Sequence, residues 1–64
     1  MSKVTEKERP VLAKAIRRNL VEFGYTSLTL ETVSTELDKV LDGAEPENII
    51  GMMVKSQLEE NNLI

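Results

Sequence analysis

The 64-residue sequence contains no cysteine and no histidine. Without cysteine, neither a disulfide nor a thiolate metal site can form. Without histidine, the chain lacks the commonest general base and a frequent metal ligand. No apolar run approaches the ~18 residues of a membrane span, and no signal-peptide pattern opens the chain. We therefore expect a cytoplasmic protein that binds no metal and no cofactor and does not associate with membranes.

Patterns of residues that carry catalysis are missing as well. Asp38 and Asp42 are four residues apart, but we expect them on a solvated helix face rather than in the dry site that proton sharing requires. The acidic segment 38–45 does not match a calcium loop, because Val40 occupies a ligand position and Ile49 replaces the bidentate glutamate. No histidine is present to activate a hydroxyl, and the glycines are isolated. We predict that the protein is not an enzyme and has no small-molecule substrate.

The small size of the chain limits its stability. A domain of this length buries only about 60% of its unfolded surface. One such core rarely supplies more than ~3–5 kcal/mol, and small folds often depend on an additional constraint. Since disulfides and metals are excluded, oligomerisation is the constraint that remains.

The apolar spacing predicts three helices joined by short loops, at about residues 6–23, 30–41 and 46–60. A glycine follows each of the first two, which is typical of a helix end. No segment has the alternation of a strand. The predicted fold for residues 1–64 is a single all-α domain, a small three-helix bundle that resembles a helix-turn-helix and has the third helix at its centre.

Local signals place the helix ends. The segment Thr5–Glu8 is a capping box, whereas Pro10 favours a start at the first helical position. These signals compete, so we expect the first helix to begin between Glu6 and Pro10. Thr29 or Ser27 can cap the second helix. The remaining predictions are Pro46 as the first residue of the third helix, fraying of residues 59–64, and packing of Leu63 and Ile64 back onto the core.

Two helices have clear faces. The apolar face of the first predicted helix carries Leu12, Ala15, Ile16, Leu20 and Phe23. The second predicted helix has a narrow apolar seam of Leu30, Val33, Leu37, Val40 and Leu41, with Glu31, Asp38 and Asp42 on one flank and Glu36 on the other.

The third predicted helix has apolar residues over an arc of roughly 240° at ~100° per residue, whereas a surface helix needs little more than 100°. Either the same bundle covers both sides of this helix or one side binds a partner. Gly51 in mid-helix costs about 1 kcal/mol relative to alanine, which a close approach of another backbone or plain structural slack would explain. We predict a protein interface formed by Gly51, Met52, Val54, Lys55 and Leu58.

Charge is distributed unevenly along the chain. Residues 1–20 contain six basic and two acidic residues, a net charge of +4, whereas residues 21–64 contain two basic and nine acidic residues, a net charge of −7. Two interpretations remain open: attraction between the two halves, or a basic docking face for an anion. The residues predicted for nucleic-acid or anion contact are Lys7, Lys14, Arg17, Arg18 and Val21.

The segment Leu20–Tyr25, followed after a short loop by Thr29–Val33, resembles the opening of a TetR-type DNA-binding domain. In that family a first helix ends in Gly-Tyr and a capped second helix follows. The resemblance covers about residues 12–33 and implies helix-turn-helix DNA binding. The sequence departs from the family where its small-residue turn belongs, near residues 37–41, and it lacks an aromatic recognition helix.

These patterns predict a non-enzymatic small helical protein that acts by protein–protein association, as a homodimer or as a regulator that binds another protein. The alternative is a helix-turn-helix DNA-binding transcriptional regulator that uses its basic first helix. A third interpretation is an acidic inhibitor that occupies a basic site on another protein.

Overall fold

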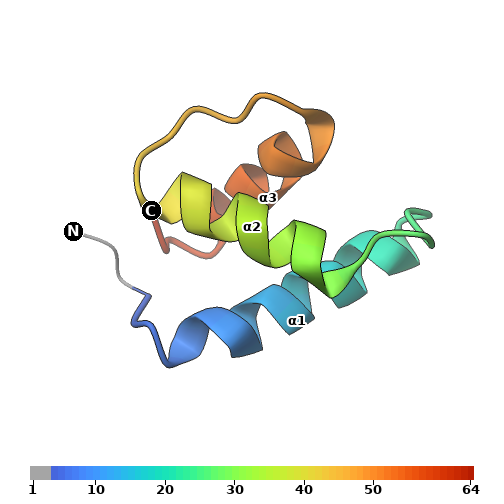
Figure 1. Cartoon of the computed structure of the whole chain (residues 1–64), viewed down its shortest axis with the longest axis horizontal. Helices are drawn as coiled ribbons and strands as arrows, with labels where there is room; N and C mark the ends of the chain where they lie inside the picture. Colours follow the sequence, from blue (N-terminus) through green and yellow to red (C-terminus); the bar gives the residue numbers. More distant parts are fainter. Residues whose placement is uncertain (1–3) are drawn as a thin grey trace.

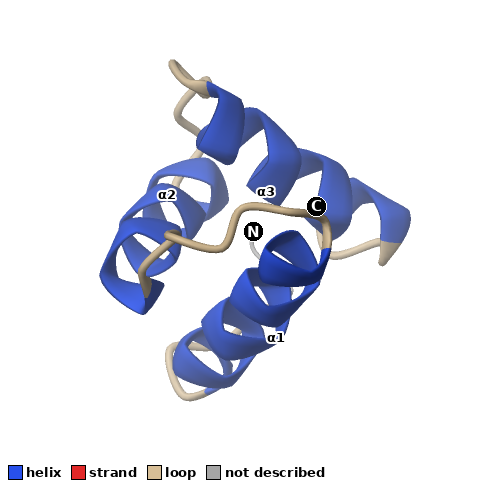
Figure 2. Cartoon of the chain, turned by 90° about the vertical axis from the view of Figure 1, so that its right-hand side faces the viewer, coloured by secondary structure: helices blue, strands red, loops and turns tan. Residues whose placement is uncertain are grey.

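The computed structural model describes residues 4–64 and contains three α-helices: α1 (Glu8–Glu22), α2 (Leu30–Leu41) and α3 (Ile49–Glu60). No strand occurs within this described range. Helix α2 packs against both α1 and α3 (Figure 1). The three helices surround a shared interior (Figure 2). The predicted all-α three-helix bundle is therefore confirmed.

The central element is α2, and the prediction of a central third helix is wrong. Helix α2 buries Glu36 on one flank in addition to Val33, Leu37 and Val40 on its apolar seam. Its interior-facing surface is therefore wider than the seam read from the sequence. The connection from α2 to α3, residues 42–48, arches across the molecule and brings α3 back onto α2 (Figure 1).

The capping box forms at the start of α1. The Thr5 N–H and hydroxyl donate to Glu8 Oε1 at 3.2 and 2.8 Å, and the Glu8 N–H donates to Thr5 Oγ1 at 3.3 Å. Pro10 is the third helical residue rather than the first, and it has no N–H to donate to the Glu6 carbonyl. The regular helix begins at Glu8, so the prediction of a start between Glu6 and Pro10 is confirmed.

All three helices end in the same left-handed turn. The residues just past α1, α2 and α3 have positive φ: +120° at Gly24, +92° at Gly43 and +56° at Asn62. In each case the following N–H returns to a carbonyl in the last turn, as Leu63 N–H does to the Leu58 carbonyl at 2.8 Å. This turn returns Leu63 to the core, as predicted, whereas Ile64 remains exposed.

The start of α3 differs from the prediction. Asn48, in extended conformation, accepts a hydrogen bond on its side-chain oxygen from the Gly51 N–H at 2.8 Å, and Ile49 is the first helical residue. Pro46 belongs to the connection instead. The asparagine satisfies one of the free N–H groups of the first turn, a stronger start signal than a proline with no cap before it. Thr29 caps α2 as predicted, accepting from the Thr32 N–H at 3.2 Å.

The core combines the interior faces of all three helices and the α1–α2 loop. Its buried members are Ala13, Ile16, Leu20, Leu28, Val33, Leu37, Val40, Val54 and Leu58. Phe23, which we predicted on the apolar face of the first helix, is 75% exposed. Phe23 is the last residue before the left-handed turn, and Tyr25 beyond that turn packs against the core instead.

Gly51 lies where α3 meets the side chain of Glu36 on α2. A Cβ atom at Gly51 would lie 2.8 Å from Glu36 Oε1 and 3.0 Å from Pro46 Cβ. Both distances are shorter than ordinary van der Waals contact. The close approach that the sequence left open therefore exists, but it comes from this chain and not from a partner.

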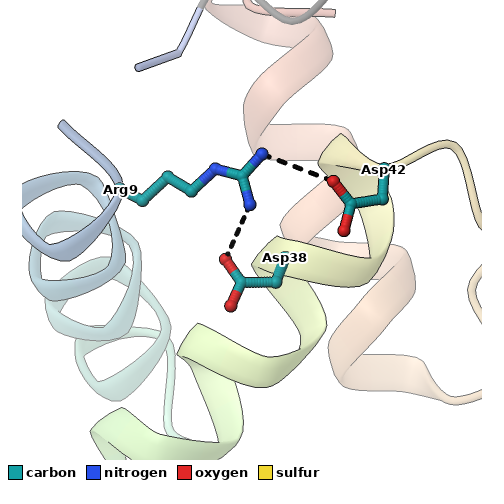
Figure 3. A network of polar contacts seen from close by, with 3 residues as sticks. All are labelled: Arg9, Asp38 and Asp42. Carbon is teal, nitrogen blue, oxygen red and sulfur yellow. Dashed lines mark hydrogen bonds and ion pairs between the residues drawn. The ribbon is translucent and has the colours of Figure 1, made fainter. Parts of the chain in front are cut away.

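Arg9 connects the start of α1 to the end of α2 (Figure 3). Its guanidinium donates to Asp38 Oδ1 at 3.2 Å and to Asp42 Oδ1 at 3.4 Å. Here the basic and acidic halves of the chain attract each other. Because both carboxylates are exposed, such a contact contributes at most about 1 kcal/mol.

None of the described helices is long and apolar enough to cross a bilayer.

Candidate protein-interaction site

The interface predicted on the third helix is largely occupied by the chain's own core. Val54 and Leu58 have no exposed surface. Gly51 is buried against Glu36 and Pro46. The wide apolar arc is covered on two sides because α3 contacts α2 and also meets side chains of α1. The prediction that Gly51, Val54 and Leu58 contact a partner is therefore wrong.

The other two predicted interface residues remain near the surface. Met52 is 57% exposed. The Lys55 ammonium lies 3.7 Å from a carboxylate oxygen of Glu45, in the connection that precedes α3. Lys55 thus pairs within the chain, and Met52 is the one exposed apolar residue of the predicted set.

Met52 belongs to an exposed apolar surface that the sequence analysis did not assemble. We define the α1–α3 patch as Phe23, Ile49 and Met52, which are 75%, 59% and 57% exposed. Ile49 and Met52 are three residues apart on α3 and therefore neighbours on its surface. Phe23 and Met52 line the same hollow between the end of α1 and α3. Phe23 was missed because its spacing matches the core face, although the helix ends there.

The hollow beside the α1–α3 patch is shallow and has both apolar and polar walls. It has a volume of about 210 Å³ and is lined by Leu20, Phe23, Met52, Met53, Ser56, Gln57 and Glu60. A neighbouring hollow of about 300 Å³ shares Phe23 and Gln57 with it and adds Asn19 and Glu22. Small-molecule sites usually measure roughly 300–1,000 Å³ and enclose most of their ligand. The first hollow is below that range and has the size that one or two inserted side chains fill.

Hydrogen bonding holds the two walls of this region together. Asn19 Nδ2 on α1 donates to Gln57 Oε1 on α3 at 3.3 Å. Leu20 forms the buried floor, and half-buried Met53 packs against the core below the patch. The patch therefore rests on a fixed base, while Met52 has the rotational freedom of an exposed methionine.

The charged groups at the edge of the two hollows are acidic. Glu60 lines the first hollow and Glu22 the second. Glu22 also lies 3.8 Å from Arg18 one turn earlier, but both side chains are well exposed, so this pair neutralises the rim weakly. Within the described residues, neither hollow is lined by lysine or arginine.

The residues predicted for nucleic-acid or anion contact do not form one free basic surface. Arg17 is half-buried, and its Nε donates to the Leu28 carbonyl at 2.9 Å, which fixes the α1–α2 loop. Val21 is also half-buried, and Arg18 pairs with Glu22. Lys7 and Lys14 are exposed. Arg17 therefore has a structural role that its spacing in the sequence did not indicate.

The geometry between α2 and α3 bears on the helix-turn-helix alternative. Residues 42–48 form a connection of seven residues, whereas the helix-turn-helix motif joins its helices by three or four. Near α3 the exposed charged residues include Glu47, Glu59 and Glu60, which repel a phosphate backbone. The geometry gives this alternative little support.

An apolar groove of about 360 Å³ lies at the start of α1, where Val11 and Leu12 meet Leu63 from the end of the chain.

The pKa of Glu8, in the first turn of α1, is below its ordinary value of 4.5. The cause is two hydrogen bonds that its carboxylate accepts from Thr5, the larger effect coming from the hydroxyl and the smaller from the backbone N–H. Among residues 4–64, no three acidic side chains gather in a way that could hold a metal ion.

Comparison of the chain with protein-family models, with curated proteins and with solved structures finds no match.

Proposed function

We propose that this protein is a non-enzymatic helical protein that acts by associating with other protein chains through the α1–α3 patch. The observation that carries the proposal is that three of the six exposed large apolar side chains of the described residues, Phe23, Ile49 and Met52, lie together along α1 and α3. Scattered exposed apolar residues are ordinary, but a cluster with a polar rim is typical of an interaction site.

The composition of the patch agrees with this role. Phenylalanine and methionine are enriched at the centres of protein interfaces. A methionine at such a surface adapts its shape to a partner at low cost. Leu20 and Met53 continue the apolar character beneath the patch, so an apolar side chain inserted there would contact both residues, with Ser56, Gln57 and Glu60 at the edge.

Site-specific photocrosslinking in the native host tests the proposal. A benzophenone amino acid would replace Met52 in one variant and Leu30, 37% exposed at the start of α2, in a matched control. We expect discrete protein adducts from position 52 and only background from position 30. Light scattering over a concentration series would then show whether the adducts include a second copy. Equal, diffuse adducts from both positions would contradict the proposal.

A further inference from the structure

We infer that the partner at the α1–α3 patch is a basic amphipathic helix of another protein rather than a second copy of this chain. This inference rests on the proposed function and adds the chemistry of the partner. Its three supports are the shape of the hollow, the sign of the charges around it, and the unfavourable symmetry of a self-contact.

The shape of the site suits the apolar face of a helix. The two hollows share Phe23 and Gln57 and so form a continuous depression along the seam between α1 and α3. A helix in a groove inserts apolar anchors three or four residues apart. The first hollow, at about 210 Å³, takes such an anchor, and exposed Ile49 and Met52 extend the apolar contact along α3.

The acidic charge at the site favours a partner whose contacting surface is basic. Glu22 and Glu60 border the hollows, and no lysine or arginine among the described residues lines them. The surrounding sequence adds to this field, since residues 21–64 carry a net charge of −7. Lysine or arginine flanking the apolar anchors of a partner would pair with the rim and accelerate association.

The same charges disfavour a second copy. A two-fold dimer brings the same patch of both chains together. When the two hollows are stacked directly on each other, Glu22 and Glu60 of both copies approach one another, and like charges across an interface are destabilising. Arg18 pairs with this rim, 3.8 Å from Glu22, but both side chains are well exposed, so it offsets the acidic charge only weakly.

Fluorescence anisotropy with two designed peptides tests the inference on the full chain. Both peptides would be 18-residue amphipathic helices with a leucine face; the polar face would be lysine in one and glutamate in the other. We expect the leucine–lysine peptide to bind at least tenfold more tightly than the leucine–glutamate peptide. The preference should weaken as salt is raised, because the rim charges are exposed.

Four variants locate the binding. Met52→Ser and Glu60→Lys should each weaken binding of the leucine–lysine peptide at least fivefold. Their matched controls, Leu30→Ser and Glu6→Lys, change exposed residues at the start of α2 and just before α1 and should leave it within twofold. Circular dichroism would confirm that all four variants fold, since each change is at an exposed position.

Several outcomes would overturn the inference. Equal affinity for the two peptides would show that the acidic rim does not select a basic partner. An equal effect of Leu30→Ser and Met52→Ser would show that the peptide does not bind at the α1–α3 patch. Patch-dependent self-association without peptide binding would replace the helical partner by a second copy and leave the proposed function intact. The absence of both peptide binding and position-52 crosslinks would reject the proposed function as well.

Discussion

Gly51 of α3 lies against Glu36 of α2, and this contact explains why position 51 is a glycine. The glycine has no side chain because Glu36 Oε1 and Pro46 Cβ occupy the space that a Cβ would need. Glu36 is a buried carboxylate whose nearest charged neighbour is Lys39, at 3.7 Å. Lys39 is on the same helix, so it can remain solvated while shielding the carboxylate.

Gly51→Ala should reduce the free energy of unfolding by about 1 kcal/mol. Alanine gains about 1 kcal/mol of helix propensity, but overpacking at a closed contact costs about 1–3 kcal/mol. Urea titration would measure the change. Ser56→Ala, at an exposed position of α3, is the control and should be neutral or slightly stabilising.

A double-mutant cycle would show whether Glu36 causes that cost. In a Glu36→Ala background the nearest obstructing atom is gone, so Gly51→Ala should become less destabilising by about 1 kcal/mol. An unchanged effect of the alanine in that background would assign the contact to Pro46 instead.

The hydrogen bonds at the start of α1 make a pH-dependent contribution. Thr5→Ala removes the hydroxyl that donates to Glu8, so the pKa of Glu8 should rise toward its ordinary value of 4.5. Because the folded-state pKa of Glu8 is lowered, its contribution is present above 4.5 and is lost as pH falls through the folded-state pKa.

Carboxyl-detected NMR titration of Glu8 would measure that shift. Thr35→Ala is a suitable control, because the Thr35 hydroxyl donates to the Glu31 backbone carbonyl and not to a carboxylate. A Glu8 pKa that is the same with and without the Thr5 hydroxyl would contradict the assignment.

At the scale of whole helices, the ends are set by short-range hydrogen bonds. Each helix ends in a left-handed residue with a return hydrogen bond, and α2 and α3 begin with side-chain caps from Thr29 and Asn48. Only α1 begins with a separate capping box followed by a proline. The capping and turn residues that flank each helix therefore set where it begins and ends.

Asn48→Ala should destabilise the protein by about 1 kcal/mol, the usual cost of losing an asparagine cap. Thr29→Ala should have a similar cost at α2. If α3 instead began at Pro46, Asn48 would lie inside the first turn, and alanine there would be neutral or stabilising. The sign of the change in thermal unfolding therefore distinguishes the two starting points.

At the scale of the whole molecule, the core is small and uses residues from all three helices. Val54 and Leu58 from α3 are as fully buried as Val33 and Leu37 from α2. The interior is therefore complete within one chain, and association is not needed to cover it. What remains for a partner is the exposed α1–α3 patch.

Leu58→Ala and Met52→Ala should separate core from surface on the same helix. Truncation of a buried leucine costs about 2–5 kcal/mol, which is comparable to the whole stability of a domain this small, so Leu58→Ala should be largely unfolded at 25 °C. Met52→Ala should change stability by no more than about 0.5 kcal/mol. Far-ultraviolet circular dichroism with urea would measure both, and a more damaging Met52→Ala would contradict the assignment.

The all-α class, the number of helices, the ends of α1 and α2 and most of the α2 seam could be predicted from the sequence alone. These features depend on spacing of 3.6 residues and on neighbours three or four positions away, which are visible along the chain. The capping residues Thr5 and Thr29 could be predicted for the same reason, because each cap is formed by residues three positions apart.

The predicted fraying of residues 59–64 is wrong, because Glu59 and Glu60 are helical and a left-handed turn at Asn62 ends α3. The start of α3 was missed because the sequence signal at Pro46 was weighed without the competing cap at Asn48.

The sequence could not show which side of each amphipathic helix is covered, or which element covers it, because that depends on how the helices pack together. Apolar periodicity shows which residues share a helix face, but it does not show where the other helices lie. It therefore cannot distinguish Val54 and Leu58, which are buried, from Met52 and Phe23, which are exposed. The arching α2–α3 connection brings α3 onto α2 and α1, burying Val54 and Leu58. The same placement leaves Met52 and Phe23 together at the surface, which is why the candidate interface differs from the one inferred from spacing.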